Sequence, residues 1–357
     1  MAVKLQILTE SYKKELLQRK LAKGSRLESV RQLAVHLKCS ASTAAKVIKN
    51  LTAEGLIISA DRKGNFFSGS HKKNIRIGYA GPTPSPSIDP LMNDAVEGVL
   101  DLLESSEDVE SVIIRHHSLK NAKVAQKILH DIDGLLLVSN FIDPSVLEVL
   151  NSNAPQTVLL DSVAICDSLL CSQVIPDFST AMQEFVQKYD LNSYSRIVLL
   201  QADNSNSKAT GNQIIKFLKI AGVNVPVEIE NLSASGSSMA MLCSYDYMAS
   251  LDKEKCKNSL FIAISGYIAR GMYQYGMKNG FLPDILSIDN LEGHGDMIDD
   301  TAFFTAVDRS MTRCFTEGAR LLIKQLKSSD DCRTVLKVPT ELIVRKSIQT
   351  STRTKEK

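Results

Sequence analysis

Residues 27–57 constrain the fold most strongly, because they carry two copies of the apolar spacing of a short amphipathic helix. In each copy, apolar residues recur at positions i, i+3, i+4 and i+7, which places them on one helix face. The first set is Val30, Leu33, Ala34 and Leu37, and the second set is Ala44, Val47, Ile48 and Leu51. A short break follows Leu37, and Ser40 or Ser42 can accept hydrogen bonds from the free N–H groups that open the second helix. The stretch therefore predicts two helices joined by a tight turn.

The outward face of the second predicted helix is small, hydroxyl-bearing and positively charged. It consists of Ala41, Ser42, Ala45, Lys46 and Lys49. Such a face fits a groove that is lined with phosphates, where a helix-turn-helix places its second helix.

The charge of the chain is divided unevenly along the sequence. Residues 1–74 contain 15 lysines and arginines against 5 aspartates and glutamates, whereas the whole chain has a formal net charge of +2. The remainder is therefore acidic. A basic region that binds a polyanion explains this division, and a solvated surface that happens to be basic is the alternative. The helix pair lies inside the basic region, which favours nucleic acid as the partner.

Two further elements flank the helix pair. Residues 4–21 carry an apolar stripe and predict a helix that closes a three-helix core. Residues 56–68 contain two short apolar runs around a group of turn-forming residues, which predicts a hairpin, or wing. Arg62 and Lys63 near its tip are placed to reach phosphates or a minor groove, and an ordinary exposed turn is the alternative.

Residues 3–69 resemble the winged helix-turn-helix of GntR-type bacterial transcription regulators. The resemblance rests on Arg26-Leu27, Ser29-Val30-Arg31-Gln32-Leu33-Ala34, Cys39-Ser40-Ala41-Ser42-Thr43, Leu51-Thr52-Ala53-Glu54-Gly55-Leu56-Ile57 and Gly64-Asn65-Phe66-Phe67. It implies that Arg31, Ser40, Ser42, Thr43 and the wing at Gly64 occupy DNA-contacting positions.

The sequence departs from the GntR pattern at three positions. Glu28 stands where the family usually has proline, and Ala41 and Ala45 stand where arginines commonly read base edges. Each such arginine is worth about 1–3 kcal/mol of discrimination at guanine. The resemblance therefore leaves the operator sequence open. Non-specific phosphate binding is expected through Lys46, Lys49, Arg62 and Lys63.

From residue 75 onward, continuous apolar strands alternate with helical patterns. The expected strands are residues 75–80, 111–116, 133–138 and 156–161 in a first series, and 196–201, 260–264 and 285–289 in a second. Such strands are typical of parallel sheets that are covered on both faces, and two series predict an α/β region with two lobes. The segments 303–307, 310–327 and 334–345 are expected to cross between the lobes. Ligands of these sheets bind beyond the carboxyl ends of the strands, here in the cleft between the lobes.

Residues 75–347 resemble the effector domain of LacI/GalR-type repressors, which is similar to the periplasmic sugar-binding proteins. The matching stretches are residues 132–136, 154–161, 208–211, 279–290 and 339–347. The resemblance implies that Asp161 and Asp289 accept hydrogen bonds from ligand hydroxyls and that Lys208 replaces a ligand-clamping arginine. It also implies that Ser265, which with Gly266 replaces a pair containing aspartate, and Asp177 line the cleft.

Two points have alternatives: which ligand binds, and what role the carboxylates of the cleft play. A sugar is the expected ligand, and another small polar metabolite or a degenerate cleft is the alternative. Asp161 and Asp289 follow strands, so they can equally be structural carboxylates that cap a loop or helix.

Signals of other functions are missing from the sequence. It contains no GxxxxGK[ST] loop, HExxH or GxSxG motif, and its histidines show no metal-ligand spacing, so we expect no enzyme activity, cofactor or metal. Seven scattered cysteines without a CxxC pair predict reduced thiols. No apolar run approaches the roughly 20 residues of a membrane span, and the first residues do not resemble a secretory signal, so we expect a cytoplasmic protein without a membrane partner.

These observations predict a bacterial transcription regulator that binds double-stranded operator DNA as a repressor and responds to a small molecule. The expected parts are a winged helix-turn-helix domain (1–70), a linker (71–74), a two-lobed effector domain (75–347) and a polar tail (348–357). A homodimer is expected from the small size of one winged unit and from an apolar stripe on the late helix, formed by Met311, Phe315, Ala319, Leu322 and Leu326. The rival hypotheses are a cytoplasmic small-molecule binding protein without regulatory DNA binding and an enzyme on the same scaffold.

Overall fold

The computed structural model of this protein consists of two compact units, residues 1–74 and residues 75–357. The structure describes residues 2–19, 21–60, 64–68, 75–86, 88–139, 144–153, 156–163, 171–298, 301–328 and 332–349. The predicted linker at 71–74 and residues 350–357 of the predicted tail lie outside the described residues.

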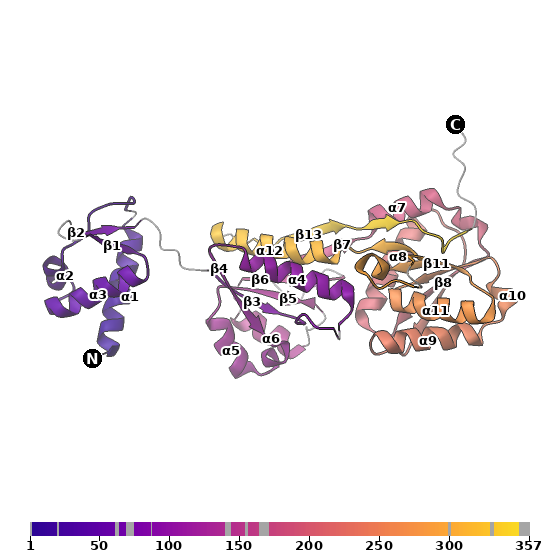
Figure 1. Ribbon diagram of the computed structural model, residues 1–357, viewed down its shortest axis with the longest axis horizontal. Coiled ribbons are helices and arrows are strands. Elements are labelled where there is room, and N and C mark those ends of the chain that lie inside the picture. Colours follow the sequence, from indigo (N-terminus) through magenta and orange to yellow (C-terminus); the bar gives the residue numbers. More distant parts are fainter. Residues whose placement is uncertain are drawn as a thin grey trace, which may run out of the picture. The chain divides into compact units, whose positions relative to one another are not determined.

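The first unit is a three-helix core followed by a two-stranded wing (Figure 1). Its elements are α1 (Ala2–Gln18), α2 (Val30–His36), α3 (Ala41–Ala53), β1 (Ile57–Ala60) and β2 (Gly64–Phe67). Both predicted apolar stripes of the helix pair pack into the core of this unit, together with Tyr12 and Leu16 of α1. α1 ends three residues before its predicted end, and Leu21 packs against the core from the segment that follows the helix.

Side-chain caps determine where α2 and α3 begin. Ser29 and Gln32 form a capping box, in which each side chain accepts a hydrogen bond from the backbone N–H of the other residue. Ser40 accepts a hydrogen bond from the N–H of Thr43 at 3.1 Å, and Lys38 turns the chain with a φ of +48°. The predicted turn is therefore confirmed, with Ser40 rather than Ser42 as the cap.

The wing is an antiparallel pair in which Ile57 lies opposite Phe67 and Ala60 lies opposite Gly64. Arg26 forms a further antiparallel bridge with Phe66, so the segment before α2 lies beside β2. The predicted hairpin is confirmed. Arg62 and Lys63, which were predicted to lie at its tip, fall outside the described residues.

The second unit is an α/β structure with two lobes, each built on a six-stranded sheet. The sheet of lobe one has the order β13-β7-β6-β5-β3-β4, and all of its neighbouring strands are parallel. Lobe one contains β3 (Ile75–Ala80), α4 (Pro90–Glu104), β4 (Val109–Ile114), η1 (His116–Lys120), α5 (Ala122–His130), β5 (Gly134–Val138), α6 (Pro144–Asn153), β6 (Gln156–Leu160), β7 (Ser172–Asp177), α12 (Met311–Ser328) and β13 (Val335–Pro339).

Lobe two repeats this plan with the strand order β14-β12-β11-β10-β8-β9, in which only the β12–β14 pair is antiparallel. It contains α7 (Ser179–Lys188), η3 (Leu191–Ser193), β8 (Arg196–Ala202), α8 (Ser205–Ile220), β9 (Val227–Leu232), α9 (Ser237–Ser250), α10 (Lys253–Cys256), β10 (Ser259–Ala263), α11 (Gly266–Asn279), β11 (Asp284–Ile288), η4 (Leu291–His294), β12 (Thr305–Asp308) and β14 (Glu341–Ile343). The predicted fold class, a winged helix-turn-helix with a two-lobed parallel-sheet region, is confirmed.

The central strands are apolar throughout because helices cover both faces of each sheet. In β5, Leu136 and Val138 pack toward α4 and α12, whereas Leu135 and Leu137 pack toward α5 and α6. Figure 1 shows these two helix pairs on opposite faces of the sheet. The edge strand β9 was not predicted, because the charged residues Glu228, which is exposed, and Glu230, which is half-buried, interrupt the apolar run.

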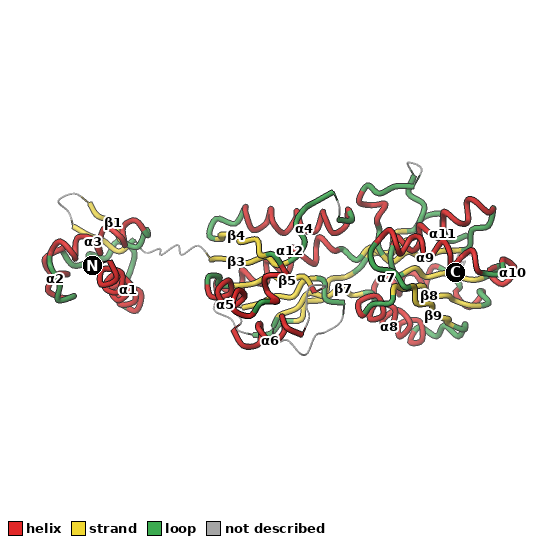
Figure 2. The backbone as a smooth tube through the Cα atoms, turned by 90° about the horizontal axis from the view of Figure 1, so that it is seen from below, coloured by secondary structure: helices red, strands yellow, loops and turns green. Residues whose placement is uncertain are grey.

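The chain crosses between the lobes after β7, after β12, and between β13 and β14, and the backbone trace in Figure 2 follows these crossings. The predicted stripe on α12 requires a correction. Met311, Phe315, Ala319 and Leu322 are buried in the core of lobe one, and Leu326 packs against that core. They cover the sheet of their own lobe, so this stripe gives no argument for a dimer.

Candidate functional site

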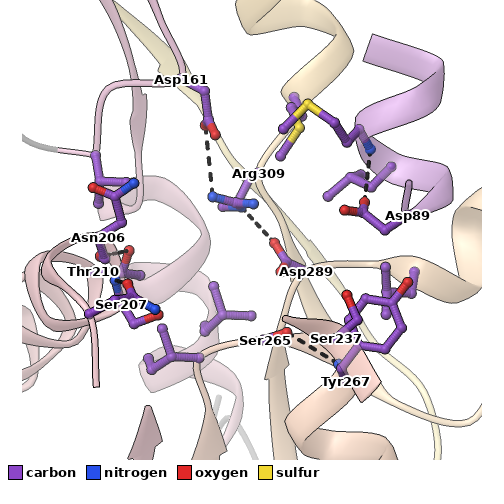
Figure 3. A pocket seen from close by; sticks show the side chains of 18 of the residues that line it. Asp89, Asp161, Asn206, Ser207, Thr210, Ser237, Ser265, Tyr267, Asp289 and Arg309 are labelled. Atoms are coloured by element: carbon purple, nitrogen blue, oxygen red, sulfur yellow. Dashed lines mark hydrogen bonds and ion pairs between the residues drawn. The ribbon is translucent and has the colours of Figure 1, made fainter. Parts of the chain in front are cut away.

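A cavity of about 450 Å³ lies at the carboxyl ends of β6 and β11, where the two lobes face each other. Figure 3 shows that carboxylates, hydroxyls and amides surround it. Its polar lining residues are Asp89, Asp161, Asn204, Ser205, Asn206, Ser207, Thr210, Ser237, Ser265, Tyr267, Asp289 and Arg309. The volume is in the usual range of about 300–1,000 Å³ for small-molecule sites.

Asp161 and Asp289 occupy equivalent positions in the two lobes. Asp161 directly follows β6 in lobe one, and Asp289 directly follows β11 in lobe two. Both have a positive φ, +50° and +107°, which is uncommon for a residue with a side chain and costs free energy. The two strand ends therefore hold their carboxylates in strained backbone conformations at the cavity.

Arg309 lies between these carboxylates (Figure 3). Its Nε donates to Asp289 Oδ1 at 2.6 Å, and its Nη1 lies 3.7 Å from Asp161 Oδ1. Sequence reasoning missed this residue. The signal was present, because Arg309 follows the predicted strand 303–307 in the crossing to α12, at the same edge as Asp161 and Asp289.

The carboxylates of the cavity are held in an unfavourable electrostatic environment. The pKa of Asp289 is raised to about 6: burial raises it most, Arg309 opposes the rise, and Asp89 and Asp161 add to it. Burial also raises the pKa of Asp161, with Arg309 opposing and Asp89 adding to the rise. Asp161 Oδ1 is buried and accepts no hydrogen bond from any residue that the structure describes. One guanidinium therefore does not neutralise the carboxylates around it.

Hydroxyl and amide groups form the remaining polar wall. The first turns of α8 contribute Asn206, Ser207 and Thr210, and Asn204 caps this helix by accepting from the N–H of Ser207. The start of α11 contributes Ser265, which caps it by accepting from the N–H of Tyr267 at 3.3 Å. Such groups both donate and accept hydrogen bonds, as recognition of a polyhydroxylated molecule requires.

A second layer of polar contacts positions the loop after β11. Arg345 donates to Asn290 Oδ1 at 2.7 Å and lies 3.2 Å from Glu292 Oε2. Asn290 in turn donates to Asp308 Oδ2 at 2.9 Å. These bonds connect the residue after Asp289 with the residue before Arg309, so they fix the two partners of the ion pair relative to each other.

Two predicted ligand residues lie away from the cavity. Lys208 is half exposed and pairs with Asp203 at 2.5 Å, because the first turn of α8 directs it toward the loop before the helix. Asp177 lies at the end of β7, where it accepts from the N–H of Ser179 at 3.0 Å and its carbonyl accepts from Thr340. Asp177 therefore joins two lobe crossings, and the cation at the cavity is Arg309 instead of Lys208.

The predicted DNA-binding residues of α3 lie on its exposed side. Ser40, Ser42, Lys46 and Lys49 are exposed, and Thr43 is half-buried beside its cap Ser40. Arg31 is exposed on α2. Within the described residues, no ion pair is formed by Arg31, Lys46 or Lys49.

A cation that the prediction did not include lies beside Gly64, at the start of β2. Gly64 has a φ of +110°, and a Cβ built there would lie 3.6 Å from Arg26 Nε. Arg26 is exposed and comes from the segment that pairs with β2. It belongs to the motif that carries the GntR resemblance, which was the available signal.

The acidic side chains of the first unit are tied to other partners. Glu28 accepts from Tyr12 at 2.6 Å and from Arg19 at 2.9 Å, and Arg19 also pairs with Glu15. Burial alone would raise the pKa of Glu28, but these hydrogen bonds outweigh it and lower the pKa to about 2. α3 itself, Ala41–Ala53, contains no aspartate or glutamate beside its basic residues.

Among the described residues, no group of three or more histidine, cysteine, aspartate or glutamate side chains is arranged to hold a metal ion. No helix among them is both long and apolar enough to pass through a membrane.

The comparisons with known proteins gave a family match for the first unit and similar solved structures for the fold of the chain. Residues 8–67 match the family described as "Bacterial regulatory proteins, gntR family". No curated protein matches the chain.

Solved structures of LacI-family regulators are similar in fold. A LacI family transcriptional regulator from Enterococcus faecium with bound ribose has 14% identity and a TM-score of 0.59, over 76% of this chain and 98% of that one. The regulator CCPA from Weissella paramesenteroides with bound glucose has 16% identity and a TM-score of 0.59, over 76% and 98%. The trehalose repressor from Escherichia coli has 14% identity and a TM-score of 0.56, over 76% and 100%. The chain therefore combines an N-terminal region that matches the gntR family with a second unit whose fold is similar to that of LacI-family regulators.

Proposed function

We propose that this protein is a DNA-binding transcription repressor whose operator affinity is controlled by a small molecule bound between the lobes of its second unit. One observation carries the proposal: a basic helix-turn-helix that matches the gntR family is joined to a two-lobed unit with a polar cavity. The matched structures are regulators, which favours a regulator over an enzyme.

In the DNA-binding part, α3 enters the major groove and the wing contacts the adjacent backbone. Lys46 and Lys49 bind phosphates, because they are exposed cations on a helix that contains no aspartate or glutamate. The short side chains of this face favour close approach of the helix to the groove. The proposed DNA contacts are Arg31, Ser40, Ser42, Thr43, Lys46, Lys49, Arg62, Lys63 and Gly64, and Arg26 is added from the structure.

In the ligand-binding part, a sugar or sugar derivative binds in the cavity. Ribose and glucose are bound in two of the similar structures, and the hydroxyl and amide wall beside Asp161 and Asp289 has the chemistry for such a molecule. Asp161, Ser265 and Asp289 are proposed as contacts. Arg309 takes the place that Lys208 was predicted to fill.

The two functions are coupled through the lobes. Asp161 belongs to lobe one and Asp289 to lobe two, so a ligand that contacts both favours one lobe arrangement over another. The ligand shifts the population by its difference in affinity for the two arrangements and by no more. A homodimer would convert this shift into a changed spacing of two DNA-binding units, and sedimentation at micromolar concentration tests for it.

A mobility-shift assay on the DNA upstream of the protein's own gene tests the function. We expect retardation by the full chain, weakening with salt, and release when the inducing sugar is added. The double variant Lys46→Ala/Lys49→Ala should lose retardation, whereas Lys127→Ala, an exposed lysine of α5, should keep it. Absence of retardation at moderate ionic strength would favour the alternative, a small-molecule binding protein without regulatory DNA binding.

A further inference from the structure

The charges that line the cavity do not balance. Among the described lining residues, three are carboxylates, Asp89, Asp161 and Asp289, and one is a cation, Arg309. Figure 3 shows Arg309 between Asp161 and Asp289, with Asp89 on the lobe-one side of the same space. The described lining of the cavity therefore has an excess of negative charge.

The neighbouring groups do not supply the missing positive charge. Lys208, the nearest lysine on α8, pairs with Asp203 outside the cavity. Three helix starts at the cavity are capped by side chains: Asn204 accepts from Ser207, Ser265 from Tyr267, and Asp89 from Met92. Each cap satisfies one of the N–H groups that would otherwise favour an anion at that helix start. The start of α9, whose Ser237 also lines the cavity, has no side-chain cap.

One carboxylate oxygen is left without a donor. Asp161 is 3% exposed, and its Oδ1 lies 3.7 Å from Arg309 Nη1, which is too far for a hydrogen bond. A buried charged group without a hydrogen bond is costly, so this oxygen calls for a donor from outside the described residues. A donor that carries a positive charge would both donate a hydrogen bond to this oxygen and reduce the excess of negative charge.

We propose that the ligand is a polyhydroxylated amine of the size of a monosaccharide, such as an amino sugar, whose ammonium group binds Asp161 and whose hydroxyls bind the wall formed by α8 and α11. This inference rests on the proposed function and specifies its ligand. The ammonium group complements Arg309, so that two positive charges face three carboxylates. The raised pKa values of Asp161 and Asp289 agree with this assignment, because the described lining residues supply too little positive charge for both carboxylates.

The charge excess also disfavours two other ligand classes, anionic sugars and neutral sugars. A phosphorylated or carboxylated sugar would bring further negative charge beside Asp161 and Asp289. A neutral sugar can donate to Asp161 Oδ1 but leaves the excess unchanged. The preferred order is therefore amine over neutral sugar over anion.

Calorimetric titration of the full chain with matched probes tests this order. The probes are D-glucosamine, D-galactosamine and D-mannosamine, each with its parent hexose and its N-acetyl derivative, which has no charge. We expect at least one amine to bind more tightly than both of its neutral counterparts by about tenfold, or about 1.4 kcal/mol. Equal or tighter binding of the neutral sugars, or binding of none of the amines, would overturn the proposal.

Two variants assign the preference to Asp161. Asp161→Asn keeps the shape of the side chain and removes its charge, so it should abolish the preference for the amine. Asp101→Asn, which changes an exposed carboxylate of α4 in the same lobe, should leave it intact. A preference that survives in Asp161→Asn, with the unliganded melting temperature showing a folded protein, would contradict the assignment.

The same samples distinguish this inference from the proposed function. If neutral sugars bind and release DNA in the mobility-shift assay without any preference for the amine, only the amine proposal fails. If amino sugars bind but the chain does not retard DNA, only the regulator proposal fails.

Discussion

Glu28 in the first unit and Asp289 in the second are both carboxylates that accept a hydrogen bond from an arginine, yet their pKa values move in opposite directions. The pKa of Glu28 is lowered to about 2, because the donors Tyr12 and Arg19 outweigh its partial burial. The pKa of Asp289 is raised to about 6, because burial and its acidic neighbours outweigh Arg309.

The difference lies in the number of partners. Around Glu28, every donor and acceptor is supplied by the unit itself, so the cluster holds α1 to the segment before α2. Around Asp289, the chain brings more carboxylates than cations together and leaves Asp161 Oδ1 without a donor. A cluster satisfied from within is structural, whereas an unbalanced buried cluster points to a ligand.

Arg309→Met breaks the second cluster and is expected to have the largest effect. Removing the cation leaves buried carboxylates unpaired, which typically costs about 3–5 kcal/mol. The folded pKa values of Asp161 and Asp289 would then rise further above their unfolded values, so stability is lost as the pH rises through them. Urea unfolding of the variant should show a larger loss at pH 8 than at pH 5.

Arg313→Met is the control for this variant, because Arg313 is an exposed arginine on α12. It should change the free energy of unfolding by less than about 0.5 kcal/mol at either pH. A loss in Arg309→Met that does not depend on pH would show that packing of the arginine, and not its charge, stabilises the cleft.

Glu28→Gln breaks the first cluster and is expected to cost less. The variant loses the charge that accepts the hydrogen bonds from Tyr12 and Arg19. Because Glu28 and Arg19 are partly exposed to solvent, we expect a loss of about 1–2 kcal/mol at pH 7. Amide hydrogen exchange in α1 and α2 measures it. Because the folded pKa of Glu28 is lowered, its contribution is present above its unfolded pKa of about 4.5 and fades as the pH falls toward 2. Wild type and variant should therefore converge in acid.

The two clusters also differ in how far sequence could predict them. Local patterns fix the first unit: the spacing of Val30 to Leu51 gave the helix pair, and a turn-former group gave the hairpin. In the cleft, Asp161 and Asp289 were predicted from the resemblance to LacI/GalR-type effector domains, and both line the cavity. Arg309 was not, because its role depends on residues 20 and 148 positions away that meet only after the lobes fold.

Lys46→Ala tests whether the unpaired positive charge on α3 binds DNA phosphates, as the unbalanced charge of the cleft is proposed to bind a ligand. Loss of one phosphate contact should weaken DNA binding about three- to tenfold and reduce the slope of log affinity against log salt by about 0.9. Fluorescence anisotropy across a salt series measures both. Lys127→Ala, the exposed lysine of α5, should leave the slope unchanged, and a reduced slope in that control would remove the assignment to α3.

Lys208→Ala is expected to have the smallest effect, although sequence placed this residue in the cleft. Its side chain is half exposed and pairs with Asp203, and solvent-exposed pairs of this kind contribute about 0–1 kcal/mol. The positive charge beside the carboxylates comes from Arg309. Removing Lys208 should therefore leave the affinity for the probe sugars within about twofold of wild type, as is usual for a surface substitution. Calorimetric titration of the variant decides between the two cations. A loss of affinity well beyond twofold would mean that Lys208 reaches the ligand when the lobes close, and that the cavity holds more positive charge than its described lining provides.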